Sequence, residues 1–149
     1  MVQVIIPISS DSKYFPRDEY FFPKPLISVD GSPMILRVLE NLEKYLSISK
    51  YIFILPSELS TKYTLDKIIS LNTNVNCEFV YKRGDTNGAL CSVMLGIDKI
   101  SENEEIIISN MDEIISYDLQ KIISFFKSKD SLGGLISFES NHPRQCYLD

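Results

Sequence analysis

The chain has 149 residues, a net charge of −5 and 44% hydrophobic residues. This length suits one domain with a sizeable core, and we expect residues 1–149 to form a single domain. The negative charge argues against nucleic acid as a partner, because nucleic-acid-binding domains usually carry a basic patch. No apolar run approaches the length that spans a bilayer, which also argues against a membrane partner.

The three cysteines, Cys77, Cys91 and Cys146, are scattered along the chain and odd in number. This pattern favours reduced thiols in a cytoplasmic protein over a disulfide framework. A zinc site is not indicated, because the single histidine, His142, belongs to no Cys/His cluster. The N-terminus lacks the basic stretch of a signal peptide, and we therefore predict a cytoplasmic location.

Apolar runs of strand length alternate along the chain with segments of helical periodicity. One helix is expected within residues 30–46, with Ser32 as its N-cap and Pro33 at its first position. The other expected helices span residues 59–70, 88–100 and 117–129. Strands are predicted at residues 2–6, 51–55, 77–81, 105–109 and 133–138.

This alternation predicts an α/β fold with a mainly parallel sheet between two helical layers. Ligands of such sheets bind at the carboxyl ends of the strands, near the point where the strand order reverses. The candidate site therefore lies in the loops that follow the first, third and fourth predicted strands.

Two charged residues of these loops each have two interpretations. Asp112 follows the strand at 105–109 and suits a hard cation such as Mg²⁺, which uses one or two carboxylates plus substrate phosphates. Alternatively, Asp112 caps a turn. Lys24 stands between Pro23 and Pro25, which stiffen the chain, as a phosphate-binding charge requires. Alternatively, it is a solvated lysine in a proline-rich turn.

The loop before residue 88 also has two interpretations. Gly88 lets a flat ligand approach the backbone at a helix start, where N–H groups favour anions. In the alternative, the loop is an ordinary connection in which Thr86 or Asn87 is the N-cap.

The order of these segments resembles that of the sugar-phosphate nucleotidyltransferases, also called nucleotide-sugar pyrophosphorylases. The most specific segment is FPKPLISVDGSPMI, and GDTNGAL and IIISNMDEII follow at the expected distances. The resemblance runs from Val4 to Tyr147. It implies a three-layer αβα Rossmann-like fold. It also implies transfer of a nucleotidyl group from a nucleoside triphosphate to a sugar phosphate or similar phosphate, releasing pyrophosphate, in cell-surface polysaccharide biosynthesis.

The resemblance also implies roles for individual residues. Lys24 aligns with the lysine that contacts the reacting phosphates, and Asp112 with a metal-binding aspartate, so Mg²⁺ is the expected cofactor. The implied chemistry is in-line attack by the acceptor phosphate on the α-phosphorus, which needs positioning and charge neutralisation but no nucleophilic side chain. The residues expected to bind the nucleotide are Pro7, Ile8, Ser9, Ser10, Ser12, Lys13, Thr86 and Gly88.

The first loop departs from the family pattern G-x-G-x-R. Ser10 and Ser12 replace the two glycines, and Tyr14 replaces the arginine. Serine adopts the conformations open to glycine at a cost, and tyrosine cannot neutralise pyrophosphate. The chain also ends near the point where the family's acceptor-binding half begins. We therefore expect the truncated N-terminal part of a longer family domain, poorly active or inactive by itself.

Two other functions remain open. The first is a non-catalytic relative that binds a nucleotide or sugar nucleotide and has lost the phosphate loop, since fold does not imply function. The second is a glycosyltransferase of similar fold, although the segment NMD supplies one carboxylate of its usual pair. The nucleotide base, the acceptor phosphate and the oligomeric state are not indicated by the sequence.

Overall fold

The computed structural model describes residues 1–9, 15–16 and 18–137. The chain divides into two compact units, Met1–Leu119 and Gln120–Asp149. The first unit carries the sheet and the candidate site, and the expectation of a single domain stays a prediction. Within the described ranges, no helix has the length and apolar character needed to cross a membrane.

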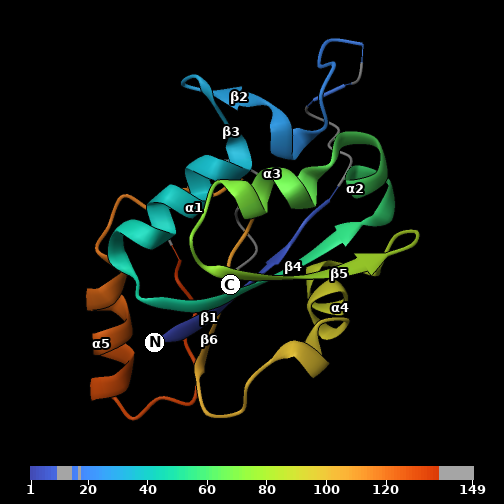
Figure 1. Cartoon of the computed structure of the whole chain (residues 1–149). Coiled ribbons are helices and arrows are strands. Elements are labelled where there is room, and N and C mark those ends of the chain that lie inside the picture. Colours follow the sequence, from blue (N-terminus) through green and yellow to red (C-terminus); the bar gives the residue numbers. More distant parts are fainter. Residues whose placement is uncertain (10–14, 17, 138–149) are drawn as a thin grey trace. The chain divides into compact units, whose positions relative to one another are not determined.

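The order of elements agrees with the sequence prediction for the four strands of the main sheet and the helical segments between them (Figure 1). The strands are β1 (Val2–Pro7), β2 (Ser28–Val29), β3 (Ser32–Pro33), β4 (Ile48–Pro56), β5 (Asn76–Lys82) and β6 (Glu105–Ile108). The α-helices are α1 (Met34–Tyr45), α2 (Ser57–Tyr63), α3 (Leu65–Leu71), α4 (Ala89–Met94) and α5 (Leu119–Ser128). Two 3₁₀ turns complete the set, η1 (Lys24–Leu26) and η2 (Ile97–Lys99).

The main sheet has the strand order β5-β4-β1-β6, and every neighbouring pair is parallel. Four predicted strands are thus confirmed in one sheet, and the α/β Rossmann-like class is confirmed with them. The chain leaves β1 for β4 on one side and later returns to β6 on the other side. The strand order therefore reverses at β1, and ligands of such sheets typically bind at the carboxyl ends of the strands beside this point.

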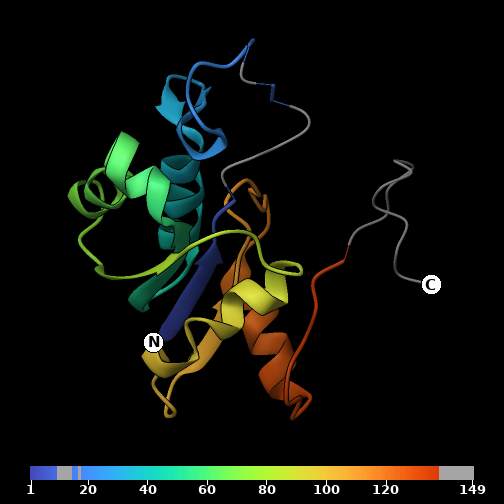
Figure 2. The same ribbon diagram turned by 90° about the vertical axis from the view of Figure 1, so that its right-hand side faces the viewer.

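Successive side chains of a strand point to opposite faces of the sheet. Both faces are buried along β1 and the second half of β4, whereas the edge strand β6 is largely exposed. On one face, Ile5, Ile52 and Ile54 pack with Val93 of α4. On the other face, Tyr51 and Phe53 are fully buried. Figure 2 shows α1 and α3 on one side of the sheet and α4 on the other. The first unit therefore has the three layers that the sequence predicts.

A short hairpin precedes α1 and corrects the predicted start of this helix. Strands β2 and β3 pair antiparallel across Asp30 and Gly31, which have φ values of 49° and 82°. Two positive φ values are typical of the tight turns that close hairpins. Because Ser32 and Pro33 pair in this hairpin, Pro33 takes the cap position and α1 begins one residue later than predicted, at Met34.

The helix predicted at 59–70 is two helices, α2 and α3. The break lies at Thr64, whose φ of 52° is left-handed and cannot continue a helix. The backbone N–H of Thr64 still donates to the carbonyl of Ser60 at 2.9 Å, which closes the last turn of α2.

The helix predicted at 88–100 also divides, into α4 and η2, and Gly96 lies between them. A Cβ atom on Gly96 would approach side-chain atoms of Ile52 and Ile54 to 3.3 Å. The chain therefore passes close to the sheet at this glycine, and the helix ends before it.

The second unit contains most of α5, within the range predicted for a helix. The strand predicted at 133–138 is wrong for residues 133–137, which form no strand, while residue 138 lies outside the described residues. Gly134 lies directly against Phe126, because a Cβ atom there would come within 2.2 Å of the ring. Two consecutive glycines also weaken a strand.

Truncation of Phe53 tests the sheet core. Phe53 is fully buried, and its ring centroid lies 5.4 Å from that of Phe79. We expect Phe53→Ala to lower the free energy of unfolding by about 3–5 kcal/mol through lost burial and a cavity. Phe21 is 85% exposed and provides a matched control. Phe21→Ala should change stability by less than about 0.5 kcal/mol in the same denaturant titration. Equal effects of the two variants would contradict the core assignment.

Candidate functional site

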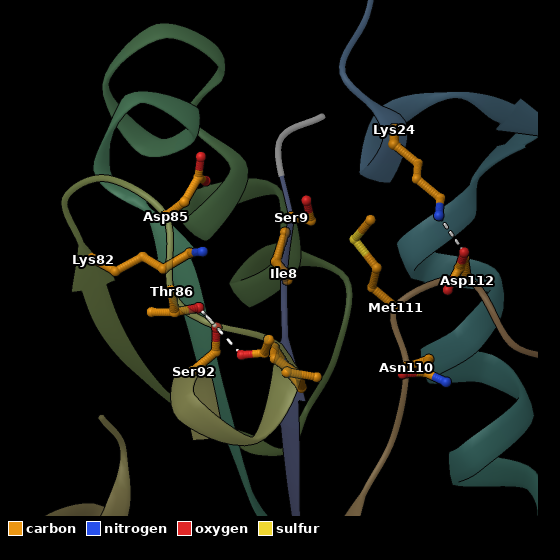
Figure 3. Close-up of a pocket in the computed structure, with 13 residues that line it drawn as sticks. Ile8, Ser9, Lys24, Lys82, Asp85, Thr86, Ser92, Asn110, Met111 and Asp112 are labelled. Atoms are coloured by element: carbon orange, nitrogen blue, oxygen red, sulfur yellow. Dashed lines mark hydrogen bonds and ion pairs between the residues drawn. The ribbon is translucent and has the colours of Figure 1, made fainter. Parts of the chain in front are cut away.

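A cleft of about 320 Å³ opens at the carboxyl ends of the main sheet (Figure 3). Its walls come from the ends of β1 and β5, from η1, from α4 and from the loop after β6. The structure thus brings together the three loops that the sequence selects. Of the predicted site residues, those that line this cleft are Pro7, Ile8, Ser9, Lys24, Thr86, Gly88 and Asp112. Ser10, Ser12 and Lys13 lie outside the described residues.

The floor of the cleft is an extension of β1. The backbone N–H of Ile8 donates to the carbonyl of Ile54 at 2.7 Å, which continues the ladder between β1 and β4 past Pro7. Ile8 is 2% exposed, so its side chain anchors the chain where the first loop leaves the sheet. The chain is therefore held against the sheet as far as Ile8, the residue before Ser9.

An ion pair between Lys24 and Asp112 forms one wall of the cleft. Lys24 begins η1, which is anchored by the buried Pro25. The Lys24 side chain is 17% exposed and that of Asp112 is 36% exposed, so the pair is partly shielded from water. The ammonium of Lys24 also lies 5.9 Å from the ring centroid of Phe15. Lys24 is therefore held in place and is not a solvated lysine in a turn.

The loop that carries Asp112 is tied to α1 by a side-chain amide. Asn41 donates through Nδ2 to the carbonyl of Ile115 at 3.1 Å. Its Oδ1 accepts from the backbone N–H of Ile115 at 3.0 Å. Met111, next to Asp112, is 4% exposed and anchors the same loop. Asp112 therefore projects from a loop that is fixed on both sides.

The opposite wall is built from the loop between β5 and α4. The hydroxyls of Thr86 and Ser92 share a hydrogen bond of 2.6 Å, and the Thr86 hydroxyl also donates to the carbonyl of Gly88 at 3.3 Å. Gly88 has φ 102°, a conformation that residues with a side chain rarely adopt. Gly88 itself takes the cap position of α4, so the alternative of Thr86 or Asn87 as N-cap is wrong.

Groups with perturbed acidity lie outside the cleft. Burial, together with the neighbouring Glu43, raises the pKa of the Cys77 thiol to about 11. The same two causes raise the pKa of Tyr51. Neither residue lines the cleft, and both stay protonated near neutral pH. The described part of the chain also contains no group of three or more metal-binding side chains. The cleft is thus lined by charged side chains and hydroxyls. Neither Cys77 nor Tyr51 can act in it as an activated nucleophile.

Several lining residues were not predicted as site residues: Lys82, Asp85, Ala89, Ser92, Asn110 and Met111. Lys82 and Asp85 lie in the loop that the sequence selects after the third strand, but neither belongs to the segment GDTNGAL in a position with an implied role. The spacing of Thr86 and Ser92 carries no sequence pattern, because their contact depends on how Gly88 turns the chain. Asn41, which supports the site from α1, is also an unpredictable partner, since 74 residues separate it from Ile115.

Comparison with known proteins identifies the family. A family model described as "Nucleotidyl transferase" matches residues 20–147, which is most of the chain. The chain therefore belongs to the nucleotidyl transferase family, and the resemblance seen in the sequence is confirmed. A curated relative, "Uncharacterized protein in xynA 3'region" from Caldicellulosiruptor sp. (strain Rt8B.4), is 29% identical over 106 residues. These residues cover 70% of this chain and 25% of that protein.

Solved structures with a similar fold include HddC from Yersinia pseudotuberculosis, which has also been crystallised with GMP-PN. Its TM-score is 0.66 at 23% identity, and the match covers 85% of this chain and 54% of HddC. An inositol-1-phosphate CTP transferase from T. maritima has a TM-score of 0.62 at 17% identity, covering 76% of this chain and 44% of that one. At these identities the likeness shows the fold. The chain spans about half the length of these structural relatives and a quarter of the curated one.

Removal of the Asn41 amide tests how the Asp112 loop is held. In Asn41→Leu, the backbone N–H and C=O of Ile115 lose their partners. A hydrogen bond contributes about 0.5–1.5 kcal/mol to stability, so the two half-buried bonds together contribute about 1–3 kcal/mol. We expect a loss of unfolding free energy in this range and faster hydrogen exchange at the Ile115 amide. Asn74 is exposed, and Asn74→Leu should alter neither quantity. An unchanged exchange rate at Ile115 in Asn41→Leu would contradict the role of these two hydrogen bonds in holding the loop.

Proposed function

We propose that this chain binds a nucleoside triphosphate in the cleft. We further propose that it takes part in transferring the nucleotidyl group to a sugar phosphate or similar phosphate. The observation that carries the proposal is the Lys24–Asp112 ion pair, which faces the Thr86–Ser92 wall across a cleft at the sheet's carboxyl edge. The family match, HddC crystallised with GMP-PN and the inositol-1-phosphate CTP transferase support nucleotide chemistry over a glycosyltransferase reaction.

In the proposed reaction, a phosphate oxygen of the acceptor attacks the α-phosphorus of the triphosphate. The bond from this phosphorus to the oxygen that bridges to the β-phosphate breaks, and pyrophosphate leaves with the electron pair. No side chain forms a covalent bond, so the chain contributes positioning and charge neutralisation. Lys24 is the proposed catalytic residue, because its ammonium would neutralise charge on the reacting phosphates.

Pro7, Ile8, Ser9, Thr86 and Gly88 are the proposed nucleotide-binding residues. The first three form the fixed floor at the end of β1. Gly88 presents backbone without a side chain, so a flat ring can approach closely. The Thr86 hydroxyl is oriented by Ser92. Proposed roles for Ser10, Ser12 and Lys13 rest on the sequence alone.

The donors of the cleft fit a magnesium ion that arrives with its nucleotide. Asp112 supplies a carboxylate at the cleft wall, and one of its oxygens, Oδ2, is paired with Lys24. Mg²⁺ commonly uses one or two protein carboxylates and completes its shell with waters and substrate phosphates. When bound, Mg²⁺ would neutralise phosphate charge beside Asp112. The Lys24 ammonium would then exchange its carboxylate partner for a phosphate oxygen.

The finer parts of the proposal follow from the family resemblance. The product would be a nucleotide sugar or a related compound, serving polysaccharide biosynthesis in the cytoplasm. We expect slow turnover by this chain itself, because serines and a tyrosine occupy the glycine and arginine positions of the first loop. Measuring pyrophosphate release from each nucleoside triphosphate, with Mg²⁺ and a panel of sugar phosphates, tests this. Binding without turnover would favour the non-catalytic relative.

Substitution of Lys24 tests the phosphate contact. We expect Lys24→Met to weaken binding of the preferred Mg²⁺–nucleoside triphosphate about tenfold or more, as for other hydrogen bonds to charged groups. Isothermal titration calorimetry measures this, and thermal unfolding verifies that the variant folds. Lys62 on α2 lies outside the cleft, so Lys62→Met is a matched control that should bind like the wild type. Wild-type affinity in Lys24→Met would refute the proposed role.

The affinity of the chain for Mg²⁺ should depend on whether nucleotide is bound. Because Lys24 occupies one oxygen of Asp112, we expect weak Mg²⁺ binding to the free chain and stronger binding once nucleotide is present. This coupling should be lost in Asp112→Asn, whose neutral amide is a poorer ligand for a hard cation. Titrations of Mg²⁺ with and without nucleotide measure the coupling. Equal Mg²⁺ affinity in the two titrations would contradict the proposed exchange.

A further inference from the structure

Lys82 is a second lysine of the cleft, on the wall opposite Lys24. It is the last residue of β5, where it is paired in register with Pro56 of β4. Its carbonyl accepts a hydrogen bond of 3.2 Å from the Ser57 hydroxyl. The backbone that carries the side chain is therefore fixed from two directions. Figure 3 shows the side chain extending from the end of β5 toward Ile8 and Ser9, from the side opposite Lys24.

The two lysines of the cleft differ in their counter-charges. The Lys24 ammonium is paired with Asp112. Within the described ranges, the Lys82 ammonium forms neither an ion pair nor a hydrogen bond. Asp85 lies on the same loop and is exposed, and no ion pair joins its carboxylate to Lys82. Lys82 is thus a partly buried positive charge that lacks a counter-charge among these residues.

We propose that Lys82 binds the phosphate chain of the nucleotide, from the side opposite Lys24. This inference rests on the proposed function and adds a residue to the same site. An ammonium group has donors and no acceptor, so its ligand must offer acceptor oxygens. A partly buried charge is stabilised most by a full opposite charge, which a phosphate chain carries and a neutral base edge lacks. The cleft then holds one end of the phosphate chain at Lys24 and another part at Lys82.

The test compares ligands that share or lack the phosphate chain. The full chain is titrated with ATP, GTP, CTP, UTP and dTTP, and the triphosphate that binds most tightly is retained. Its nucleoside, inorganic tripolyphosphate and glucose 1-phosphate are then measured, by competition where binding is weak. The variants are Lys82→Met, Lys82→Arg and the matched control Arg83→Met. Arg83 is adjacent and exposed, and it does not line the cleft.

We expect Lys82→Met to weaken binding of the triphosphate and of tripolyphosphate about tenfold or more, because hydrogen bonds to charged groups contribute strongly. Binding of the nucleoside should not change. Lys82→Arg should retain most of the affinity, and Arg83→Met should behave like the wild type. The loss in Lys82→Met should also shrink as salt concentration rises, since the contact is electrostatic.

Other results overturn the inference. Unchanged triphosphate affinity in Lys82→Met refutes the contact. An equal loss for the nucleoside and the triphosphate would place Lys82 at the base or ribose, and a loss for glucose 1-phosphate alone would place it at the acceptor. A wild-type chain that binds no triphosphate overturns the proposed function itself, and this inference with it. Thermal unfolding verifies each variant, and Lys82→Gln replaces Lys82→Met if the latter does not fold.

Discussion

The parallel pairing of β1 with both β4 and β6 is the constraint on which the rest of the structure depends. β1 is buried along its length. Its parallel pairing with β4 and β6 places the carboxyl ends of these three strands side by side at one edge of the sheet. Because the strand order reverses at β1, the loops after β1 and β6 diverge and leave space between them. The cleft occupies this edge, so its position follows from backbone pairing and not from any single side chain.

Under the proposed function, an anionic ligand would change the partners of charged groups that are already paired in the cleft. Lys24 and Asp112 neutralise each other, which lowers the cost of keeping either charge partly buried. A ligand that carries both phosphate and a divalent cation satisfies each member of the pair separately. A ligand with phosphate alone would compete with Asp112 for Lys24. Under the proposed function, this arrangement would favour a metal–phosphate complex over either component.

The sequence sufficed for the sheet and for the loops of the site, and the reasons are physical. Continuous apolar runs such as Val4–Ile6 and Ile52–Leu55 are typical of strands buried on both faces, and they indicated four parallel strands correctly. The break at Thr64 carries no sequence signal, because this left-handed residue is neither a glycine nor a proline. The strand at 133–138 is predicted from a short apolar run, but a strand also needs a pairing partner that such a run does not reveal.

The two walls of the cleft are stabilised by different contacts. The Asp112 wall is tied to α1 by the Asn41 amide, which pairs with the backbone as a neighbouring strand would. The opposite wall depends on the conformation of Gly88 and on the contact between the Thr86 and Ser92 hydroxyls. Changes on the second wall can therefore alter ligand contacts without moving the ion pair.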